Sequence, residues 1–397
     1  MGLAYTIEPR LDLASAEGWH LHDRSGRLFV DLTSGWNVTN AGWNRAEIDV
    51  AWAKQGAASW FRPSWCDNSQ LDALHQRMEL IAPGRSIIAS CSGSEAIDNA
   101  LKLARLVTGR AGVIRFEGAY HGSGTGASLA TGYHVPHLDP LLPHAPVLDL
   151  PLPEEPGAVE VAEAAIRAFE EAGALVFETV LTNMACRELP KAYRAMLSRV
   201  CNELGIILIA DEIGTGMNRL GAFFSTLDGV PDRDQPDIVV SAKALTNGLY
   251  PLSLCLVRER LAMQCDAGWF GSTYAAMPSA CAAAVATIDM HLANGLGQRA
   301  ANTGTAFAQA LRDQTAAVAG VTAVAGAGLE LALHLDWKIL KCQGLTPFTL
   351  LERLADAGLF ATLSPSENHL MLMPPLVTPV DVLFGAAETI AGVLARA

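Results

Sequence analysis

The sequence predicts an α/β fold built on a mainly parallel β-sheet. Between residues 86 and 211, short apolar runs typical of buried strands alternate with segments of helical spacing. Such alternation favours parallel strands joined by right-handed crossovers. Beyond Gly295 the pattern changes to helices and antiparallel-looking strands. We therefore expect a large domain over residues 46–294 and a small α+β domain over residues 295–397, with residues 1–45 packing beside the small one.

The elements follow from spacing and turn residues. Residues 19–35 alternate around Asp23–Gly26, which predicts a hairpin. Apolar residues at helical spacing predict helices at 46–58, 69–82, 95–108, 158–172, 191–204 and 278–293. Gly109 is expected to end the third helix. Strands are expected at 86–90, 111–116, 174–178, 206–211, 328–335 and 370–373. The Pro-rich stretch 136–156 shows no regular pattern.

Composition narrows the class of protein. Half of the 397 residues are hydrophobic, and the net charge is -13. That charge argues against nucleic acid or an anionic membrane as a partner, although it leaves room for a small anionic ligand. The first eight residues have neither a basic region nor an apolar run, so we expect no signal peptide. None of the eight cysteines has CxxC or zinc spacing, so we expect no metal and a reducing cytoplasm.

Two strand-like runs end in residues that could do chemistry. The run from Ile206 ends in the pair Asp211–Glu212, and the run after Asp237 is followed by Lys243. The carboxyl ends of parallel strands meet at one edge of a sheet, where α/β proteins bind ligands. An amine held there beside a carboxylate suits Schiff-base chemistry with pyridoxal phosphate (PLP).

A phosphate site is expected where a strand runs into a helix, at Ser92-Gly93-Ser94. Free backbone N–H groups at a helix N-terminus attract anions, and glycine allows close approach. The alternative is that a serine there only caps the helix. The glycine-rich loop around Gly122 lacks the GxGxxG spacing and the following acidic residue of a dinucleotide site, which argues against an NAD-dependent oxidoreductase.

Taken together, these segments resemble the class III (ornithine and omega type) aminotransferases, which are PLP enzymes of fold-type I. The resemblance covers the chain from about Trp36 to the C-terminus. It rests on these motifs: Asp211-Glu-Ile-Gly-Thr-Gly216 with Arg219, Asp237-Ile-Val with Lys243, Ser92-Gly-Ser-Glu-Ala96, Tyr120-His-Gly122, Glu178, Gly271-Ser-Thr273 and Met373-Pro-Pro-Leu376. It implies a mainly parallel seven-stranded sheet flanked by helices, and a small α+β domain formed from both termini.

The resemblance also implies roles for individual residues. Lys243 would carry PLP as a Schiff base and move a proton on the substrate, while Asp211 would keep the pyridine nitrogen protonated. Tyr120 would stack on the ring. The remaining implied cofactor contacts are Ser92, Gly93, Ser94, His121, Glu178 and Ile213. Thr273 would reach the cofactor of a neighbouring subunit, which implies a homodimer.

The chain departs from the family where a substrate carboxylate is commonly bound. Positions that often hold arginine are Met371, Ser123 and the stretch 358–362 here. Arg62 could bind a carboxylate instead, other polar contacts could serve as they do in aminomutases, or the substrate could be largely apolar. The candidate substrate residues are Trp36, Trp60, Arg62, Glu212 and Ser272. Packing is the alternative role for the tryptophans, and a structural ion pair is the alternative for Glu178 and Glu212.

We therefore expect a PLP-dependent aminotransferase that moves an amino group between an amino acid or amine and a keto acid or aldehyde. An aminomutase similar to glutamate-1-semialdehyde aminomutase and an amino-acid racemase or epimerase remain alternatives, because the same lysine can serve each reaction. A PLP-binding protein without turnover is disfavoured by the intact pair Lys243 and Asp211.

Overall fold

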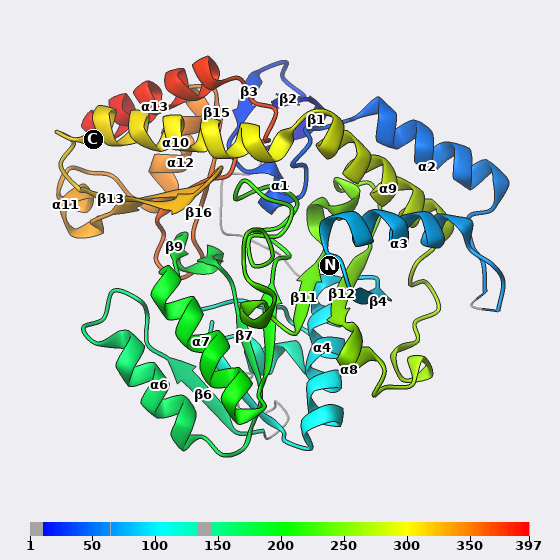
Figure 1. The fold of residues 1–397 in the computed structure, drawn as a ribbon. Helices are drawn as coiled ribbons and strands as arrows, with labels where there is room; N and C mark the ends of the chain where they lie inside the picture. Colours follow the sequence, from blue (N-terminus) through cyan, green and yellow to red (C-terminus); the bar gives the residue numbers. More distant parts are fainter. Residues whose placement is uncertain (1–10, 64, 134–144, 397) are drawn as a thin grey trace, which may run out of the picture.

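The computed structural model describes residues 11–63, 65–133 and 145–396 (Figure 1). Expectations for residues 1–10 and 136–144 lie outside these ranges. The large sheet has seven strands in the order β4-β12-β11-β10-β7-β5-β6. They are β4 (Arg85–Ser90), β5 (Gly112–Phe116), β6 (Val147–Leu150), β7 (Ala172–Phe177), β10 (Ile207–Asp211), β11 (Ile238–Ser241) and β12 (Ser253–Arg258).

The expected mainly parallel seven-stranded sheet is confirmed. Only β12 runs against its two neighbours, β11 and β4, while the other pairings in this sheet are parallel. Strand β6 was not expected, because it lies in the stretch that shows no pattern. It is a four-residue edge strand that is only partly buried, so its sequence carries no clear alternation.

Helices cover both faces of this sheet (Figure 1). They include α2 (Ala46–Ala58), α3 (Ser69–Ile81), α4 (Gly93–Thr108), α6 (Ala158–Ala168), α7 (Lys191–Leu204), α8 (Glu259–Ala262) and α9 (Pro278–Ala293). Along β10, Leu208 and Ala210 face the core formed with α3, α6, α7 and α9, whereas Ile207 and Ile209 face the core formed with α4. Burial on both faces explains why these strands are continuous apolar runs.

Two further sheets involve the C-terminal part of the chain. One has the order β13-β14-β17-β16, from β13 (Val321–Ala327), β14 (Glu330–Leu335), β16 (Thr362–Leu363) and β17 (Leu370–Leu372). The other joins β1 (Leu13–Glu17), β2 (His20–Asp23) and β3 (Leu28–Asp31) to β15 (Leu359–Phe360). Helices α10 (Leu296–Thr315) and α13 (Val380–Ala395) pack side by side (Figure 1). Helices α11 (Trp337–Cys342) and α12 (Pro347–Asp356) complete this part.

Short elements connect the larger ones. They are α1 (Ser34–Asn37), α5 (Ala127–Ala130), β8 (Val180–Leu181), β9 (Arg187–Glu188), η2 (Thr182–Met184), η3 (Asp232–Asp234), η4 (Lys243–Thr246) and η5 (Ala267–Phe270). Gly109 ends α4 in the left-handed conformation, as expected. The helix expected at 158–172 ends at Ala168, and the following strand begins at Ala172 instead of at residue 174.

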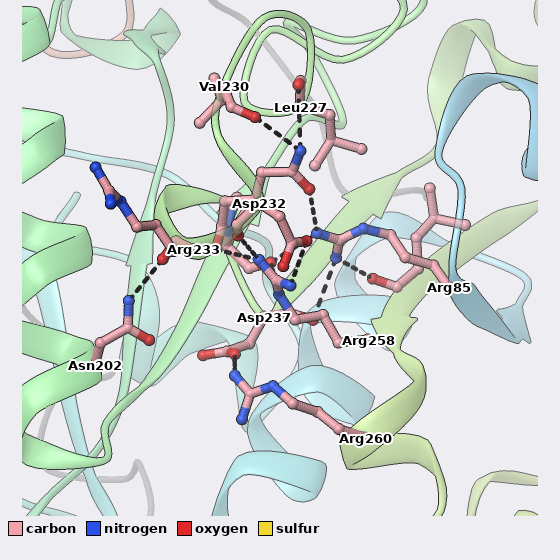
Figure 2. A network of polar contacts seen from close by, with 12 residues as sticks. Arg85, Asn202, Leu227, Val230, Asp232, Arg233, Asp237, Arg258 and Arg260 are labelled. Carbon is pink, nitrogen blue, oxygen red and sulfur yellow. Dashed lines mark hydrogen bonds and ion pairs between the residues drawn. The ribbon is translucent and has the colours of Figure 1, made fainter.

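A polar network holds the amino ends of β10 and β11 (Figure 2). The carboxylate of Asp237, just before β11, accepts a hydrogen bond of 3.0 Å from the backbone N–H of Leu208 and one from Arg260. Arg85 donates to the backbone carbonyl of Pro236 at 2.8 Å, and Arg258 forms an ion pair of 2.8 Å with Asp232. The network fixes the register of the two strands at the end opposite Asp211 and Lys243.

Two findings bear on the surroundings of the chain. In the described ranges, no helix is long and apolar enough to cross a membrane. All eight cysteines are free, and burial raises the pKa of the Cys255 thiol to about 12. Such a thiol is inert at neutral pH.

Candidate active site

Asp211 and Lys243 meet at the carboxyl edge of the large sheet. Asp211 is the last residue of β10 and pairs with Val240 of β11, while Lys243 begins η4 two residues after β11 ends. Both line one pocket of about 370 Å³. Lys243 has a φ of 45°, which is unusual for a residue with a side chain and is held by its surroundings. The structure therefore gathers an amine and a carboxylate in one cavity.

Both oxygens of Asp211 are fixed. Oδ2 lies 2.8 Å from Nδ1 of His121, and Oδ1 accepts a hydrogen bond of 2.9 Å from the backbone N–H of Ile213. The side chains of Asp211 and His121 are buried. An ionised Asp211 requires the proton of His121 to lie on Nδ1, which leaves Nε2 as a buried acceptor with no partner among the described residues. The carboxylate is therefore held ready for a protonated ring nitrogen of a ligand.

The start of α4 lines the same pocket. Ser92 caps the helix by accepting a hydrogen bond from the backbone N–H of Glu95, and Ser92, Gly93 and Ser94 line the cavity. A Cβ on Gly93 would lie 2.8 Å from the Ile213 side chain. A Cβ on Gly122, whose φ is +122°, would lie 2.6 Å from Oγ of Ser94. Capping by Ser92 is therefore compatible with anion binding at the start of α4, and Gly93 and Gly122 keep this region free of further side-chain atoms.

Tyr120 and Glu178 complete the pocket wall. Tyr120 is 48% exposed and lines the cavity, so one surface of its ring is available to a ligand. Glu178 follows β7 and is buried, and its Oε2 has no partner in the described structure. Burial, together with the neighbouring carboxylates of Asp211 and Glu330, raises the pKa of Glu178 well above its ordinary value.

Several of the expected cofactor and substrate residues do not line this pocket. Ser272 lies near it, with Oγ 3.9 Å from Sγ of the pocket residue Cys91. Thr273 is exposed on the loop after η5 and does not line the pocket of its own chain. Glu212 faces the other way, because its Oε1 accepts hydrogen bonds from Thr226 and Ser225. Those contacts support the structural alternative for Glu212, with hydroxyl and amide donors in place of an ion pair.

The aromatic and arginine candidates are also separate from the pocket. Trp60 is 74% exposed, and both it and Arg62 lie between α2 and α3, outside the lining of this cavity. The Arg62 guanidinium donates to the backbone carbonyl of Asp67. Trp36 packs against a buried cluster that contains Met371. Within this chain, no arginine lines the described pocket.

Sequence reasoning missed several polar residues next to the pocket. Glu330, Thr182 and Asn37 are all buried, and each comes from a different segment of the chain. Glu330 could have been noticed, because it is a carboxylate in an otherwise apolar strand. Asn37 and Thr182 carry no such signal. Among the described residues, no group of three or more His, Cys, Asp or Glu is arranged to hold a metal ion.

The fold and this pocket define a PLP-dependent enzyme of fold-type I. The family model of the class III aminotransferases matches residues 5–394. An acetylornithine aminotransferase from Lactiplantibacillus plantarum is 32% identical over 94% of this chain and 92% of that protein. A 4-aminobutyrate aminotransferase from Mycobacterium bovis is 28% identical over 96% of this chain and 90% of that protein.

Solved structures agree with these relatives. A PLP-bound amine transaminase from an uncultivated Pseudomonas species is 30% identical, with a TM-score of 0.85, and the match covers 98% of this chain and 95% of that one. A second aminotransferase structure, from Methanocaldococcus jannaschii, has a TM-score of 0.91 at 22% identity, over 100% of this chain and 97% of that one, and supports the fold alone. The chain belongs to the class III aminotransferases and is a PLP-dependent aminotransferase. Nothing in these matches favours the aminomutase alternative.

Proposed function

We propose that Lys243 is the catalytic amine of this aminotransferase and that Asp211 is its electrostatic partner. The observation that carries the proposal is the meeting of the two side chains in one pocket, next to the anion cradle at Ser92-Gly93-Ser94. The cradle fits the phosphate of PLP, and the fixed carboxylate of Asp211 fits its pyridine nitrogen. PLP, when bound, withdraws electrons from the substrate and makes its Cα proton acidic.

The pocket residues of this chain would then each have a separate role in the reaction. Asp211, oriented by His121 and Ile213, keeps a ring nitrogen protonated. The amine of Lys243 would act as the general base that takes the proton from the substrate Cα, and then as the general acid that returns it during transfer of the amino group. Tyr120, Glu178 and Ile213 all line the pocket, where Tyr120 would cover one face of the PLP ring and the other two would lie beside it. The substrate is an amino acid or amine, and the acceptor is a keto acid or aldehyde.

We also propose a homodimer in the cytoplasm, in which Thr273 completes the pocket of the partner. Exposed aromatic side chains around the loop of Thr273 support an interface there, since Trp60, Trp65 and Tyr274 are largely exposed. The rings of Phe61 and Tyr274 are 6.2 Å apart. Eight free cysteines suit a reducing compartment. The pairing of β3 with β15 supports a small domain that contains both ends of the chain.

A half-reaction tests the transfer itself and separates it from the racemase alternative. The PLP form is mixed with one amino donor at a time, without an acceptor, and the absorption spectrum is followed. An aminotransferase converts the cofactor to its amine form and stops, whereas a racemase leaves the cofactor unchanged and inverts the donor. Retention of the original spectrum with every amino acid and amine tested would contradict the proposal.

A further inference from the structure

One face of β14 meets the segment 180–186 beside the pocket. Ala332 of β14 pairs with Met371 of β17, and both are fully buried in a cluster with Val180 and Cys186. Leu331 and Leu333 point to the opposite core. Glu330 precedes Ala332 by two residues and therefore shares its face. The face that has Met371 in place of a common family arginine thus carries the carboxylate of Glu330.

Glu330 is buried without a paired cation. It is 0% exposed, and its Oε1 accepts a hydrogen bond of 2.5 Å from Oγ1 of Thr182. Its Oε2 is buried without a partner in the described structure. Arg219 lies nearby, yet it donates to the backbone carbonyls of Leu329 and Pro374 at 2.9 and 2.6 Å and forms no ion pair with Glu330 in the described ranges. A nearby cation would stabilise the ionised form of a carboxylate that is buried without an ion-pair partner.

Gly214 connects this carboxylate to the pocket. Gly214 lines the cavity, and a Cβ placed on it would lie 3.5 Å from Oγ1 of Thr182 and 3.6 Å from both Nδ2 of Asn37 and Nζ of Lys243. Three polar side chains therefore meet at the spot that a residue larger than glycine would fill. Both side-chain polar atoms of Asn37 are also buried and have no partner among the described residues.

The buried polar atoms without a partner determine which kind of ligand this region could accept. Oε2 of Glu330 and Oε2 of Glu178 are acceptors, so a ligand that reaches them must bring hydrogen-bond donors. Asn37 carries both an acceptor oxygen and the donor Nδ2, and Nδ2 is the atom that lies near the Gly214 position. Two carboxylates also make the region favourable for positive charge and unfavourable for a substrate carboxylate. Burial raises the pKa of Glu330 above its ordinary value, opposed first by the hydrogen bond from Thr182 and then by the charges of Arg219 and Lys243. An ammonium group placed there would stabilise its ionised form.

We propose that this pocket selects aliphatic diamines and that Glu330, with Thr182 and Asn37, receives the distal ammonium group. The proposal rests on the aminotransferase function proposed above, which commits Lys243 to the cofactor. In the reaction, one amine nitrogen of the diamine is transferred, water supplies the oxygen of the resulting aldehyde, and the distal ammonium is unchanged. Glu330 is a specificity-determining residue that does not touch the reacting carbon.

The test compares three probes of similar length with the PLP-loaded full chain: cadaverine, pentylamine and δ-aminovalerate. Half-reaction rates are measured at several concentrations by absorbance, for the wild type, Glu330→Gln and the exposed control Glu160→Gln. We expect the wild type to favour cadaverine over the other two. Glu330→Gln should raise the cadaverine concentration that gives half of the maximal half-reaction rate on the order of thirtyfold, leaving that maximal rate and the rates with pentylamine nearly unchanged.

The outcomes separate the two proposals. If the wild type acquires no visible PLP band, the proposed function itself fails before any amine is added. If the band forms and the wild type shows no preference for cadaverine over pentylamine, or favours δ-aminovalerate, the diamine inference alone is overturned. An equal half-saturating concentration of cadaverine in Glu330→Gln and the wild type would also overturn it. The preference of the wild type keeps the inference testable even if the variant does not fold.

Discussion

Nδ1 of His121 lies 2.8 Å from Oδ2 of Asp211, and both side chains are buried behind the pocket that Lys243 lines. A hydrogen bond to a charged carboxylate contributes about 1.5–3 kcal/mol. The contact links the loop after β5 to the end of β10, so it fixes the position of the carboxylate as well as its charge.

Replacing His121 with Phe should lower kcat roughly ten- to a hundredfold, because Asp211 loses a donor and its orientation. The absorption band of bound PLP should also shift, since the ring nitrogen is less firmly protonated. Steady-state kinetics and a spectrum of the loaded protein measure both effects. The control is His75→Gln, which replaces an exposed side chain of α3 and should match the wild type. Unchanged kcat and spectrum in His121→Phe would remove His121 from the site.

Gly122→Ala should weaken PLP binding. The added Cβ would lie 2.6 Å from Oγ of Ser94, and a φ of +122° is strained for any residue with a side chain. We expect a loss of at least about 1 kcal/mol in cofactor affinity, measured by fluorescence titration of the apoprotein. Gly385→Ala in α13 is the matched control, because nothing lies within 4 Å of its added Cβ. Equal PLP affinity in both variants would show that the cradle is not at Gly122.

Asp237→Asn should reduce stability without changing catalysis. Asp237 holds the amino end of β11 through Leu208 and also through Arg260, a contact drawn in Figure 2, roughly 13 Å along the strand from its other end. We expect unfolding to become easier by about 1–3 kcal/mol, while kcat per folded molecule stays the same. Asp232→Asn removes an ion pair of an exposed carboxylate and should cost less than about 1 kcal/mol. A selective loss of kcat in Asp237→Asn would contradict the structural role.

The stability of the apoprotein should depend on pH through Glu330. Its folded-state pKa is raised by burial above the ordinary value of 4.5, so the folded chain holds the proton more tightly than the unfolded chain. Stability is therefore lost as pH rises from the ordinary pKa to the folded one. The melting temperature of Glu330→Gln should exceed that of the wild type by a margin that grows as pH rises above the ordinary pKa of 4.5. Glu160→Gln should show no such trend, and a constant margin in Glu330→Gln would refute the linkage.

The partner role of Thr273 is open to complementation. Thr273→Asp, which would repel a phosphate, should be inactive alone, and so should Lys243→Ala. Co-expressed as a mixed dimer, the two should regain activity, because one pocket combines the intact Lys243 of one chain with the intact Thr273 of the other. Activity of the purified mixed dimer is the measurement. A mixed dimer with no activity would place Thr273 in the pocket of its own chain.

Local patterns in the sequence were sufficient to predict the pair Asp211 and Lys243 and five strands of the large sheet, whereas β12 was not among the expected strands. Each of those residues ends an apolar run, and parallel strands bring such ends to one edge. Gly93 and Ser94 were equally visible, because a strand meets a helix there. By contrast, β6 was missed, since an edge strand of four partly buried residues has no distinctive alternation.

The meeting of Glu330, Thr182 and Asn37 near Gly214 could not be predicted in this way. Glu330, Thr182 and Asn37 lie on β14, on η2 and on a left-handed turn near the N-terminus, and only the tertiary structure brings them together. The position of Arg62 was equally hidden from the sequence: its guanidinium suits a carboxylate, and its segment between α2 and α3 does not line the pocket of its own chain. Chemical suitability of a residue type does not determine its position.

The most direct test of the central claim is to locate the cofactor on the chain. The PLP-loaded protein is reduced with borohydride, digested and mapped by mass spectrometry, in parallel with Lys243→Ala and with Lys191→Ala, an exposed lysine at the start of α7. We predict one reduced phosphopyridoxyl adduct, on Lys243, in the wild type and in Lys191→Ala, and none in Lys243→Ala. An adduct on another lysine, or one that persists in Lys243→Ala, would contradict the assignment of Lys243.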